Sequence, residues 1–495
     1  MSATSNLSSD PHLPGGAEDA DRRAHTRKRR RILTGQWQSL VIDHMAEHFH
    51  KLRQWIIGKP DLSTNTLRSV VRQVSALYDT EPIVRGDESV DEGCLGLMLN
   101  AVRMGGWWQL GTRHQQWVEG MRESFVRPTW TPDRGFMFRL VTPDMVYAEA
   151  HPDDPDQPEY MVEARSRIIN GKLAWTWDVV DLREEGSPTF KVVQPIQRGR
   201  GWQELDITEQ VLGRDLSGPN YPWRLQDETP VMPYVLYHAA RTDRLFDALE
   251  GRELVEGTLT IAVLWTWWLH CVRDSSWVQR YTKDVSLKGS EEGAKGLPEI
   301  THAFAVTDPQ TLLQMRSDDG QGGGEIGQWA PPVDPATLGR AIADFEIRLG
   351  AHFNLGPQDF QRSGPAESGY AISLKRSAVR EAQRRAEPQF RRGDEFLLRL
   401  CAVLLNRGGA PGGPFPEEGL SIEYPGLPMS PQEVMARTEE LAKLHPLGLV
   451  SPVDAYLALH PGATREAAMD ALQEVSTENR VLGVAPGGMT NPSAL

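Results

Sequence analysis

A long stretch of helical periodicity between residues 370 and 407 limits most strongly what this chain can fold into. Its length of about 37 residues, at ~1.5 Å of rise per residue, corresponds to a helix of ~55 Å. Such a helix is longer than a small domain is wide, so we expect it to cross the body of the protein and to contact several other elements. Pro388 predicts a kink, because proline removes one helical hydrogen bond and clashes with the preceding turn.

The faces of this predicted helix differ in chemistry. A narrow stripe suited to close packing is formed by Ala371, Leu374, Ala378, Ala382 and Ala386. The half after Pro388 is predicted to be buried because of Phe390, Phe396, Leu397, Leu400, Cys401 and Leu404. The other faces carry Lys375, Arg376, Arg380, Arg384, Arg385, Arg391 and Arg392. We expect most of these cations to pair with carboxylates of the protein, which leaves a minority for other partners.

The segment before this helix, residues 354–369, reads NLGPQDFQRSGPAESG and has a different character. Regular structure is disfavoured by Gly356, Pro357, Gly364, Pro365 and Gly369. Arg362 is the only basic residue of the segment. A polar segment between two helices is suited to line an aqueous channel, and a plain surface turn is the alternative interpretation.

Periodicity elsewhere predicts a mixture of helices and strands. Four helices are expected first, over 37–55, 64–78, 90–104 and 110–124. Strands follow over 135–150, 159–182, 189–194 and 231–237, with Asn170-Gly171 as a two-residue hairpin turn. Helices return over 244–282, 334–356 and 430–444, separated by a Gly-rich segment at 283–334 and a Pro/Gly-rich linker at 408–428. The predicted fold class is α+β, and the apolar second half of the 244–282 helix predicts packing on several sides.

The first 35 residues combine a polar stretch with the densest cationic run of the chain. Residues 1–21 are rich in Ser, Gly, Asp and Pro and predict disorder, and RRAHTRKRRR follows at 22–31. We interpret the run either as a solvated arm or as an arm that contacts phosphate or supports assembly. No signal peptide is expected, because the first apolar run follows a polar arm.

Composition narrows the possible environments and partners. The net charge of −14 argues against indiscriminate coating of nucleic acid, because phosphate repels an acidic surface. Cys94, Cys271 and Cys401 lie far apart without a CxxC pair, which predicts neither a disulfide framework nor a cysteine zinc site. No stretch approaches the ~20 apolar residues that span a bilayer, so we expect a protein without a membrane segment that is made in the cytoplasm.

Enzyme motifs are few. The best is HMAEH at 44–48, in which His44, Glu47 and His48 match the inverted zinc-hydrolase pattern H-x-x-E-H. No third ligand is evident and a five-letter pattern arises easily by chance, so the interpretation as ordinary helix residues is favoured. Neither a G-x-x-x-x-G-K-[ST] phosphate loop nor a dinucleotide fingerprint is present. The sequence therefore predicts no enzyme activity and no cofactor, with a zinc hydrolase and a nonviral helical scaffold or adaptor as the alternatives.

The order of the predicted elements resembles that of the portal proteins of tailed bacteriophages. Residues 253–281 look like the helix that enters the portal stem, and 338–360 look like the returning stem helix. Residues 368–405 look like the long wing helix that follows the tunnel loop, while 230–239 and 448–459 are weaker similarities. The likeness spans most of residues 35–480 and lies in the arrangement of the segments, since no single motif is specific.

The resemblance implies a portal-type fold with these parts. Residues 1–35 would be a disordered basic arm, 36–243 an α/β wing, 244–282 and 335–353 two stem helices, and 283–334 the clip between them. Residues 354–369 would be the tunnel loop, 370–407 the long wing helix, 408–480 a linker and helical crown, and 481–495 a flexible tail.

The resemblance also implies a function and partners. Members of this family assemble as twelve-subunit rings at one capsid vertex, and a separate terminase ATPase pumps double-stranded DNA through the central channel. Expected partners are therefore further copies of the chain, the terminase large subunit, a head-completion or adaptor protein, and the major capsid and scaffolding proteins. The expected location is the portal vertex of the virion, after assembly in the host cytoplasm.

Two groups of residues follow from these assignments. The residues implied to face DNA are Gln358, Gln361, Arg362, Ser363, Lys375 and Arg376. The residues implied to bind partners through the clip are Lys288, Glu291, Glu292 and Lys295.

Overall fold

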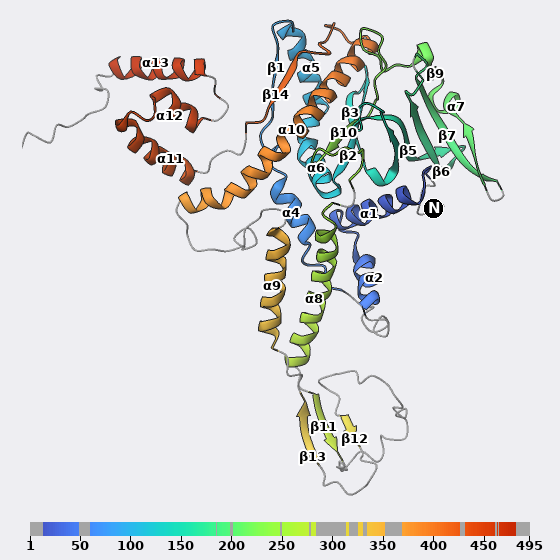
Figure 1. Cartoon of the computed structure of the whole chain (residues 1–495), viewed down its shortest axis with the longest axis vertical. Helices are drawn as coiled ribbons and strands as arrows, with labels where there is room; N and C mark the ends of the chain where they lie inside the picture. The colour runs from blue at the N-terminus through green and yellow to red at the C-terminus, as the bar shows by residue number, and fades with distance from the viewer. Residues whose placement is uncertain are drawn as a thin grey trace, which may run out of the picture. The chain divides into compact units, whose positions relative to one another are not determined.

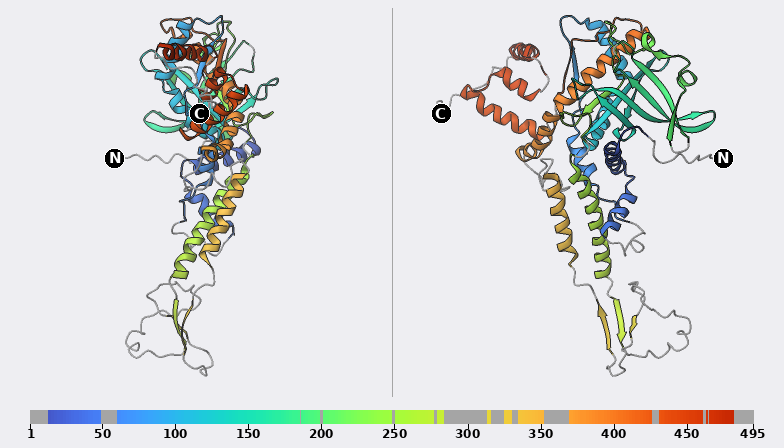
Figure 2. Two further views of the ribbon diagram at one scale, coloured as in Figure 1. Left: turned by 90° about the vertical axis from the view of Figure 1, so that its left-hand side faces the viewer. Right: turned by 45° about the vertical axis from the view of Figure 1, so that its right-hand side comes forward.

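A computed structural model describes most of the chain, in two compact units (Figure 1, Figure 2). The described residues are 13–48, 60–184, 186–198, 201–247, 250–276, 279–283, 313–315, 325–329, 334–351, 369–425, 431–460, 463 and 465–481. We call the first unit the body; it comprises Met1–Thr34, Arg68–Arg252 and Asn354–Leu495. The second, which we call the helix-pair unit, comprises Gly35–Leu67 and Glu253–Phe353.

Two antiparallel sheets form the β-rich part of the body. The smaller has the strand order β10-β2-β3, with β2 (Glu123–Thr131), β3 (Gly135–Val141) and β10 (Val235–His238). The larger has the order β4-β5-β6-β7-β8, with β4 (Val146–Ala150), β5 (Pro158–Ile169), β6 (Lys172–Asp181), β7 (Thr189–Arg198) and β8 (Gly201–Asp206). The short strand β9 (Leu216–Ser217) pairs with β7.

The predicted hairpin turn is confirmed. Ile169 pairs with Lys172 across it, and both central residues have positive φ, 50° at Asn170 and 75° at Gly171. Asn and Gly tolerate this left-handed conformation better than other residues, which is why the dipeptide predicts the turn.

Strand β2 is a central strand that the periodicity did not predict. The expected helix at 110–124 is α6 (Trp107–Met121), which ends just before β2 begins at Glu123. Pro128 lies in β2 and argues against a central strand in the sequence, because proline cannot donate to a neighbouring strand. Strand β10 pairs only with residues 123–126, so Pro128 lies beyond the end of that ladder.

The long helix α10 (Gly369–Gly408) packs within the body against both β2 and β10. It continues without a break on both sides of Pro388, at which the sequence predicts a kink. Its second half is buried as predicted: Phe390, Leu397, Leu400 and Cys401 are at most 1% exposed. These side chains share one core with α5 (Glu92–Met104), α6 and the strands of both sheets.

Further elements complete the body. Strands β1 (Ile83–Gly86) and β14 (Leu420–Glu423) form a separate antiparallel pair. Helix α7 (Thr208–Leu212) follows β8, and α11 (Pro431–Leu444), α12 (Pro452–Leu459) and α13 (Arg465–Val481) follow β14. Helix α4 (Thr66–Val74) spans the boundary between the two units.

The prediction that residues 1–35 form a disordered arm is wrong for residues 17–33, which form helix α1 (Ala17–Leu33). Its arginines bind the body: Arg22 donates to the carbonyl oxygens of Pro143 and Val146, and Arg30 pairs with the buried Asp144 at 2.8 Å. Arg29 is only 3% exposed and donates to the carbonyl oxygen of Gly120. Low apolar content predicted disorder, but here buried ionic and backbone partners compensate for the missing apolar burial.

The helix-pair unit consists mainly of α8 (Arg252–Ser276) and α9 (Pro335–Ala351), which lie side by side (Figure 1, Figure 2). Gly257 allows close approach, because a Cβ atom there would lie 2.4 Å from Cδ1 of Leu349. The Trp268 indole donates to the carbonyl oxygen of Pro335 at 2.8 Å. The unit also contains α2 (Gln38–His48) and a sheet of order β12-β11-β13, formed by Leu313–Met315, Gln279–Lys283 and Glu325–Trp329.

The second half of α8 is less covered than its apolar sequence predicted. Burial in α8 is concentrated between Leu254 and Thr266, and Leu269 remains 48% exposed. Within the part of the chain that is described, no helix combines the length and hydropathy of a membrane span.

Candidate functional site

Helix α10 is the element around which the predicted site can be assessed. Of the residues implied to face DNA, Lys375 and Arg376 lie near the N-terminal end of α10. Gln358, Gln361, Arg362 and Ser363 lie outside the described residues, as does the whole predicted tunnel loop before Gly369. The predicted clip residues Lys288, Glu291, Glu292 and Lys295 lie outside them as well.

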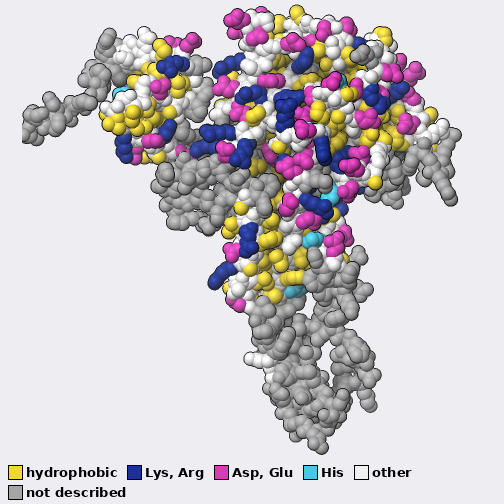
Figure 3. Space-filling view, in the orientation of Figure 1, with side chains coloured by type: hydrophobic (Ala, Val, Ile, Leu, Met, Phe, Trp, Pro, Cys, Tyr) yellow, Lys and Arg dark blue, Asp and Glu magenta, His cyan; other side chains and the backbone are white. Residues whose placement is uncertain are grey.

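The basic side chains of α10 are largely neutralised by carboxylates of the same chain. The ion pairs are Arg380–Glu433, Arg385–Glu381, Arg391–Glu387, Arg392–Asp154, Arg392–Asp156, Arg399–Glu418 and Arg407–Glu228. Arg384 is exposed and is the only arginine of α10, among those with described side chains, without an acidic partner. Figure 3 shows the same intermixing of Lys and Arg with Asp and Glu over the face of the body in view. The prediction that most of these cations pair with carboxylates is therefore confirmed.

Asp394, in the buried half of α10, binds three tyrosine hydroxyl groups. Tyr78 and Tyr424 donate to its Oδ2 at 2.8 and 2.7 Å, and Tyr237 donates to its Oδ1 at 2.7 Å. Asp394 is 0% exposed, and the three tyrosines come from segments far apart in the sequence. Sequence analysis missed this site, because one aspartate in an apolar helix and three scattered tyrosines carry no local signal.

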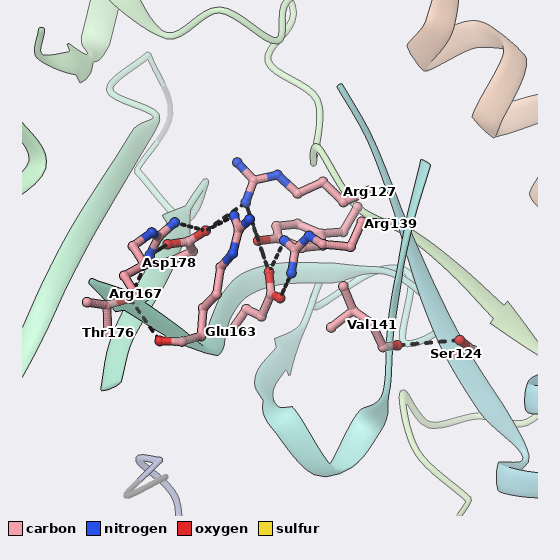
Figure 4. Close-up of polar contacts among 10 residues, drawn as sticks. Ser124, Arg127, Arg139, Val141, Glu163, Arg167, Thr176 and Asp178 are labelled. Carbon is pink, nitrogen blue, oxygen red and sulfur yellow. Dashed lines mark hydrogen bonds and ion pairs between the residues drawn. The ribbon is translucent and has the colours of Figure 1, made fainter. Parts of the chain in front are cut away.

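A second buried polar cluster joins the two sheets of the body (Figure 4). Arg127 of β2 donates to Oδ2 of Asp178 in β6 at 2.8 Å and to the Tyr234 hydroxyl oxygen at 2.9 Å. That hydroxyl donates to Oε2 of Glu163 in β5 at 2.7 Å. The cluster is completed by Arg139, which pairs with Glu163, and by Arg167, which donates to Asp178 at 2.9 Å.

In this cluster, each charged group stabilises the charged form of its partner. Burial alone would lower the pKa of Arg127, but Tyr234 and the two carboxylates raise it above its usual range. Burial alone would raise the pKa of Asp178, but Arg167 and Arg127 hold it below its usual range. Arg127 and Asp178 are therefore both charged and paired with each other, which fits a joint between sheets better than a reactive centre.

Two of the three residues of the zinc-hydrolase pattern, His44 and Glu47, have described side chains. In α2, the Nε2 atom of His44 lies 3.1 Å from Oγ1 of Thr260. The Nδ1 atom of His44 lies 3.7 Å from a carboxylate oxygen of Glu47 and 4.0 Å from one of Glu256. The side chain of His48 lies outside the described residues. Within the described ranges, no three His, Cys, Asp or Glu side chains gather in a way that could hold a metal.

Acidic and basic side chains gather next to Arg29 of helix α1. Glu123 is 0% exposed, and its Oε1 accepts a hydrogen bond from the backbone N–H of Asp247. Arg122 donates to Oε2 of Glu250 at 2.6 Å, and Arg29 donates to the carbonyl oxygen of Glu250. Burial raises the pKa of Glu123 to about 7, although the nearby arginines act in the opposite direction.

We predict that Glu123 makes the stability of the protein depend on pH around neutrality. Its folded-state pKa of about 7 lies above the usual 4.5, so its contribution is complete below pH 4.5 and lost as pH rises through 7. The Glu123→Gln variant should remove up to ~1.4 kcal/mol per pH unit from the decline in unfolding free energy between pH 5 and 8. Urea unfolding at several pH values measures this slope. Glu204→Gln, on the exposed surface of β8, is the control, and equal slopes for both variants would contradict the prediction.

Comparison with known proteins gives distant structural matches. No protein-family model matches the sequence, and no curated protein matches it. A chain from the neck of an empty gene transfer agent (GTA) particle, computed with C6 symmetry, aligns with a TM-score of 0.37 and 12% identity, covering 82% of this chain and 96% of that one. A chain from the neck of a native GTA particle, computed with C12 symmetry, gives 0.35 and 12%, covering 84% and 94%. Scores this low do not establish a shared fold, so no residue role is transferred from them.

Proposed function

We propose that copies of this chain close into a ring at one vertex of a phage-type capsid, and that the ring forms a channel for double-stranded DNA. The channel would serve packaging and ejection, and the ring would bind the terminase and a head-completion or tail protein. The chain would act as a structural conduit and not as an enzyme.

The observation that carries the proposal is the order of the elements along the chain. Helices α8 and α9 pack side by side and bracket an inserted segment that contains a small sheet. Residues 354–369 then lead directly into the 40-residue helix α10, whose second half is fixed in the core of the body. This order supports the resemblance to portal proteins that the sequence indicated.

The charge state of α10 supports a conduit more than a DNA-binding surface. Each firm phosphate contact raises affinity and salt dependence, and a ring of many such contacts would hold a duplex still. Arg380, Arg385, Arg391 and Arg392 are paired with carboxylates of their own chain. We propose that DNA meets mainly Gln358, Gln361, Arg362, Ser363, Lys375 and Arg376, which would give each subunit few cations in the channel.

Uncovered apolar side chains support contact with further copies of the chain. Figure 3 shows hydrophobic side chains gathered over α8 and α9 on the face in view. In the segment from α11 to α13, five large apolar side chains are more than half exposed: Met435, Leu447, Leu449, Met469 and Val475. Apolar surface of this kind commonly marks protein–protein contact, and neighbouring subunits of a ring would cover it.

The proposal is tested first by negative-stain electron microscopy of the purified full chain. Rings with a central opening are expected, and an exclusively monomeric preparation under assembly conditions would contradict the proposal. A nonviral adaptor would remain a monomer or a small oligomer in the same images.

Two deletions then separate the proposed roles, and each serves as the control for the other. Deletion of residues 357–368 is expected to leave rings intact but to lower DNA packaging or retention, because the segment would line the channel. Deletion of residues 288–297, which removes Lys288, Glu291, Glu292 and Lys295, is expected to weaken docking of terminase or the head-completion protein while rings persist. Loss of rings in the first variant, or normal docking in the second, would contradict the corresponding assignment.

A further inference from the structure

The carboxyl group of Asp394 is buried among neutral hydrogen-bond donors. Its three partners approach from different elements: Tyr78 follows α4, Tyr237 lies in β10, and Tyr424 follows β14. Burial of a charge is unfavourable unless hydrogen bonds replace the lost water. The three hydroxyl groups provide that replacement and at the same time connect α10 to three separate parts of the body.

Two glycines make these contacts possible. A Cβ atom on Gly393, next to Asp394, would lie 2.3 Å from the ring of Tyr237. A Cβ atom on Gly111 of α6 would lie 2.6 Å from the ring of Tyr78. Both distances are far below van der Waals contact, so larger residues at these positions would displace the rings whose hydroxyl groups reach the carboxylate.

The buried tyrosine, histidine and cysteine side chains around the carboxyl remain neutral near pH 7. Burial raises the pKa values of Tyr78, Tyr237 and Tyr424 well above the usual range, so all three retain the hydroxyl protons that they donate. Burial lowers the pKa of His114, whose ring lies 4.4 Å from that of Tyr237, to about 3. Burial likewise raises the pKa of Cys401 on α10. Arg391 of α10 is the charged group that acts on Tyr424, and it pairs with Glu387.

We propose that Asp394 is the positioning residue of helix α10, and that its ionised carboxylate holds the helix against the body through Tyr78, Tyr237 and Tyr424. Proton uptake turns this acceptor of three hydrogen bonds into a group that must itself donate one. Each tyrosine hydrogen bond is therefore weaker in the protonated form, although proton uptake also removes the larger cost of burying the charge and so stabilises the fold as a whole. The consequence for a DNA channel, that this anchor fixes the helix following residues 354–369, rests on the proposed function; the anchor itself does not.

The pH range of this change follows from the surroundings. Burial raises the pKa of Asp394 to about 6, and the hydrogen bonds from the tyrosines oppose that rise. The carboxyl group is thus mostly ionised at pH 8 and mostly protonated at pH 5. Because hydrogen bonds to a charged acceptor are about twice as strong as neutral ones, each tyrosine should contribute more at pH 8 than at pH 5.

The test uses the full chain with Tyr424→Phe, Asp394→Asn and the double variant, in urea unfolding at pH 5 and pH 8. Loss of the Tyr424 hydroxyl is expected to raise the unfolding constant roughly tenfold or more at pH 8 and about threefold at pH 5. In the Asp394→Asn background the pH dependence of this effect should disappear. Amide hydrogen exchange of residues 389–404 should accelerate in parallel at pH 8.

Tyr221→Phe is the matched control, because the Tyr221 hydroxyl donates to the carbonyl oxygen of Val231 at 2.8 Å and not to a carboxylate. The loss of unfolding free energy caused by Tyr221→Phe should be the same at pH 5 and pH 8. An equal cost of Tyr424→Phe at pH 5 and pH 8, or no coupling to Asp394→Asn, would overturn the proposal. If Tyr424→Phe does not fold, Tyr78→Phe applies the same criterion. Ring formation is measured separately by microscopy. A wild-type chain that forms no rings would contradict the proposed function but would not affect the inference that Asp394 anchors α10.

Discussion

Replacement of Asp178 by alanine is expected to destabilise the protein by about 3–5 kcal/mol, because it removes the carboxylate that binds both Arg127 and Arg167 and leaves Arg127 only the more distant Glu163, at 3.9 Å. Asp178 is 0% exposed and binds both Arg127, at 2.8 Å, and Arg167. Arg127 is itself only 7% exposed, so water cannot replace the lost carboxylate. The aromatic rings of Phe190 and Tyr234 lie 4.9 and 5.1 Å from its guanidinium carbon and would not replace a full negative charge.

Asp181→Ala provides a control within the same strand. Asp181 also pairs with an arginine, Arg183, at 2.7 Å, but both side chains are partly exposed. Exposed ion pairs contribute about 0–1 kcal/mol, so this variant should remain close to the wild type. The two free energies of unfolding are compared by urea denaturation at pH 7. Similar costs for the two variants would show that the cluster in Figure 4 does not join the sheets through buried charge.

The cluster also shows which parts of the fold local sequence could predict. The β5–β6 hairpin was predicted because its two-residue turn requires positive φ angles, which Asn170 and Gly171 adopt more readily than other residues. The buried second half of α10 was predicted because its apolar residues repeat at helical spacing. Both signals lie within a few neighbouring residues, so no knowledge of distant segments was needed.

The features that were missed depend on partners far along the chain. Helix α1 was expected to be disordered, but Asp144 and the carbonyl oxygens of the body satisfy its arginines. Strand β2 was not predicted, because Pro128 argues against a central strand. The proline is tolerated because β10 pairs only with the first part of β2. The partners of Asp394 lie 316, 157 and 30 residues away, separations that no periodicity links.

In the candidate site, too, the general pattern could be predicted from the sequence but the individual contacts could not. The pairing of the α10 arginines with carboxylates was predicted from the acidic composition, and the structure confirms it. The individual partners, such as Glu433 for Arg380, could not be predicted, because they depend on which surfaces of the body meet the helix. The assignment of residues 354–369 and 283–334 to DNA and partner contact remains a proposal that the two deletions test.

The second large effect is expected at Gly393, where valine should destabilise the protein by about 3 kcal/mol. A Cβ atom there would lie 2.3 Å from Cε1 and 2.5 Å from Cδ1 of Tyr237. That ring cannot move aside easily, since its hydroxyl is bound to Asp394 and its centroid lies 4.4 Å from that of the His114 ring in an edge-to-face arrangement. Overpacking of a close-packed core typically costs about 1–3 kcal/mol, and a β-branched residue against a fixed ring should reach the upper end of that range.

Gly96→Val is the matched control, since Gly96 also lies inside a helix, α5, but a Cβ atom there would meet nothing within 4 Å. Valine and glycine differ by only a few tenths of a kcal/mol in helix propensity, so this variant should unfold at nearly the wild-type urea concentration. In the double variant Gly393→Val/Tyr237→Ala the clash is removed, and the combined cost should fall below the sum of the two single costs. Strict additivity would mean that Tyr237 is not what excludes a side chain at Gly393, and that the close approach of α10 to β10 does not depend on this glycine.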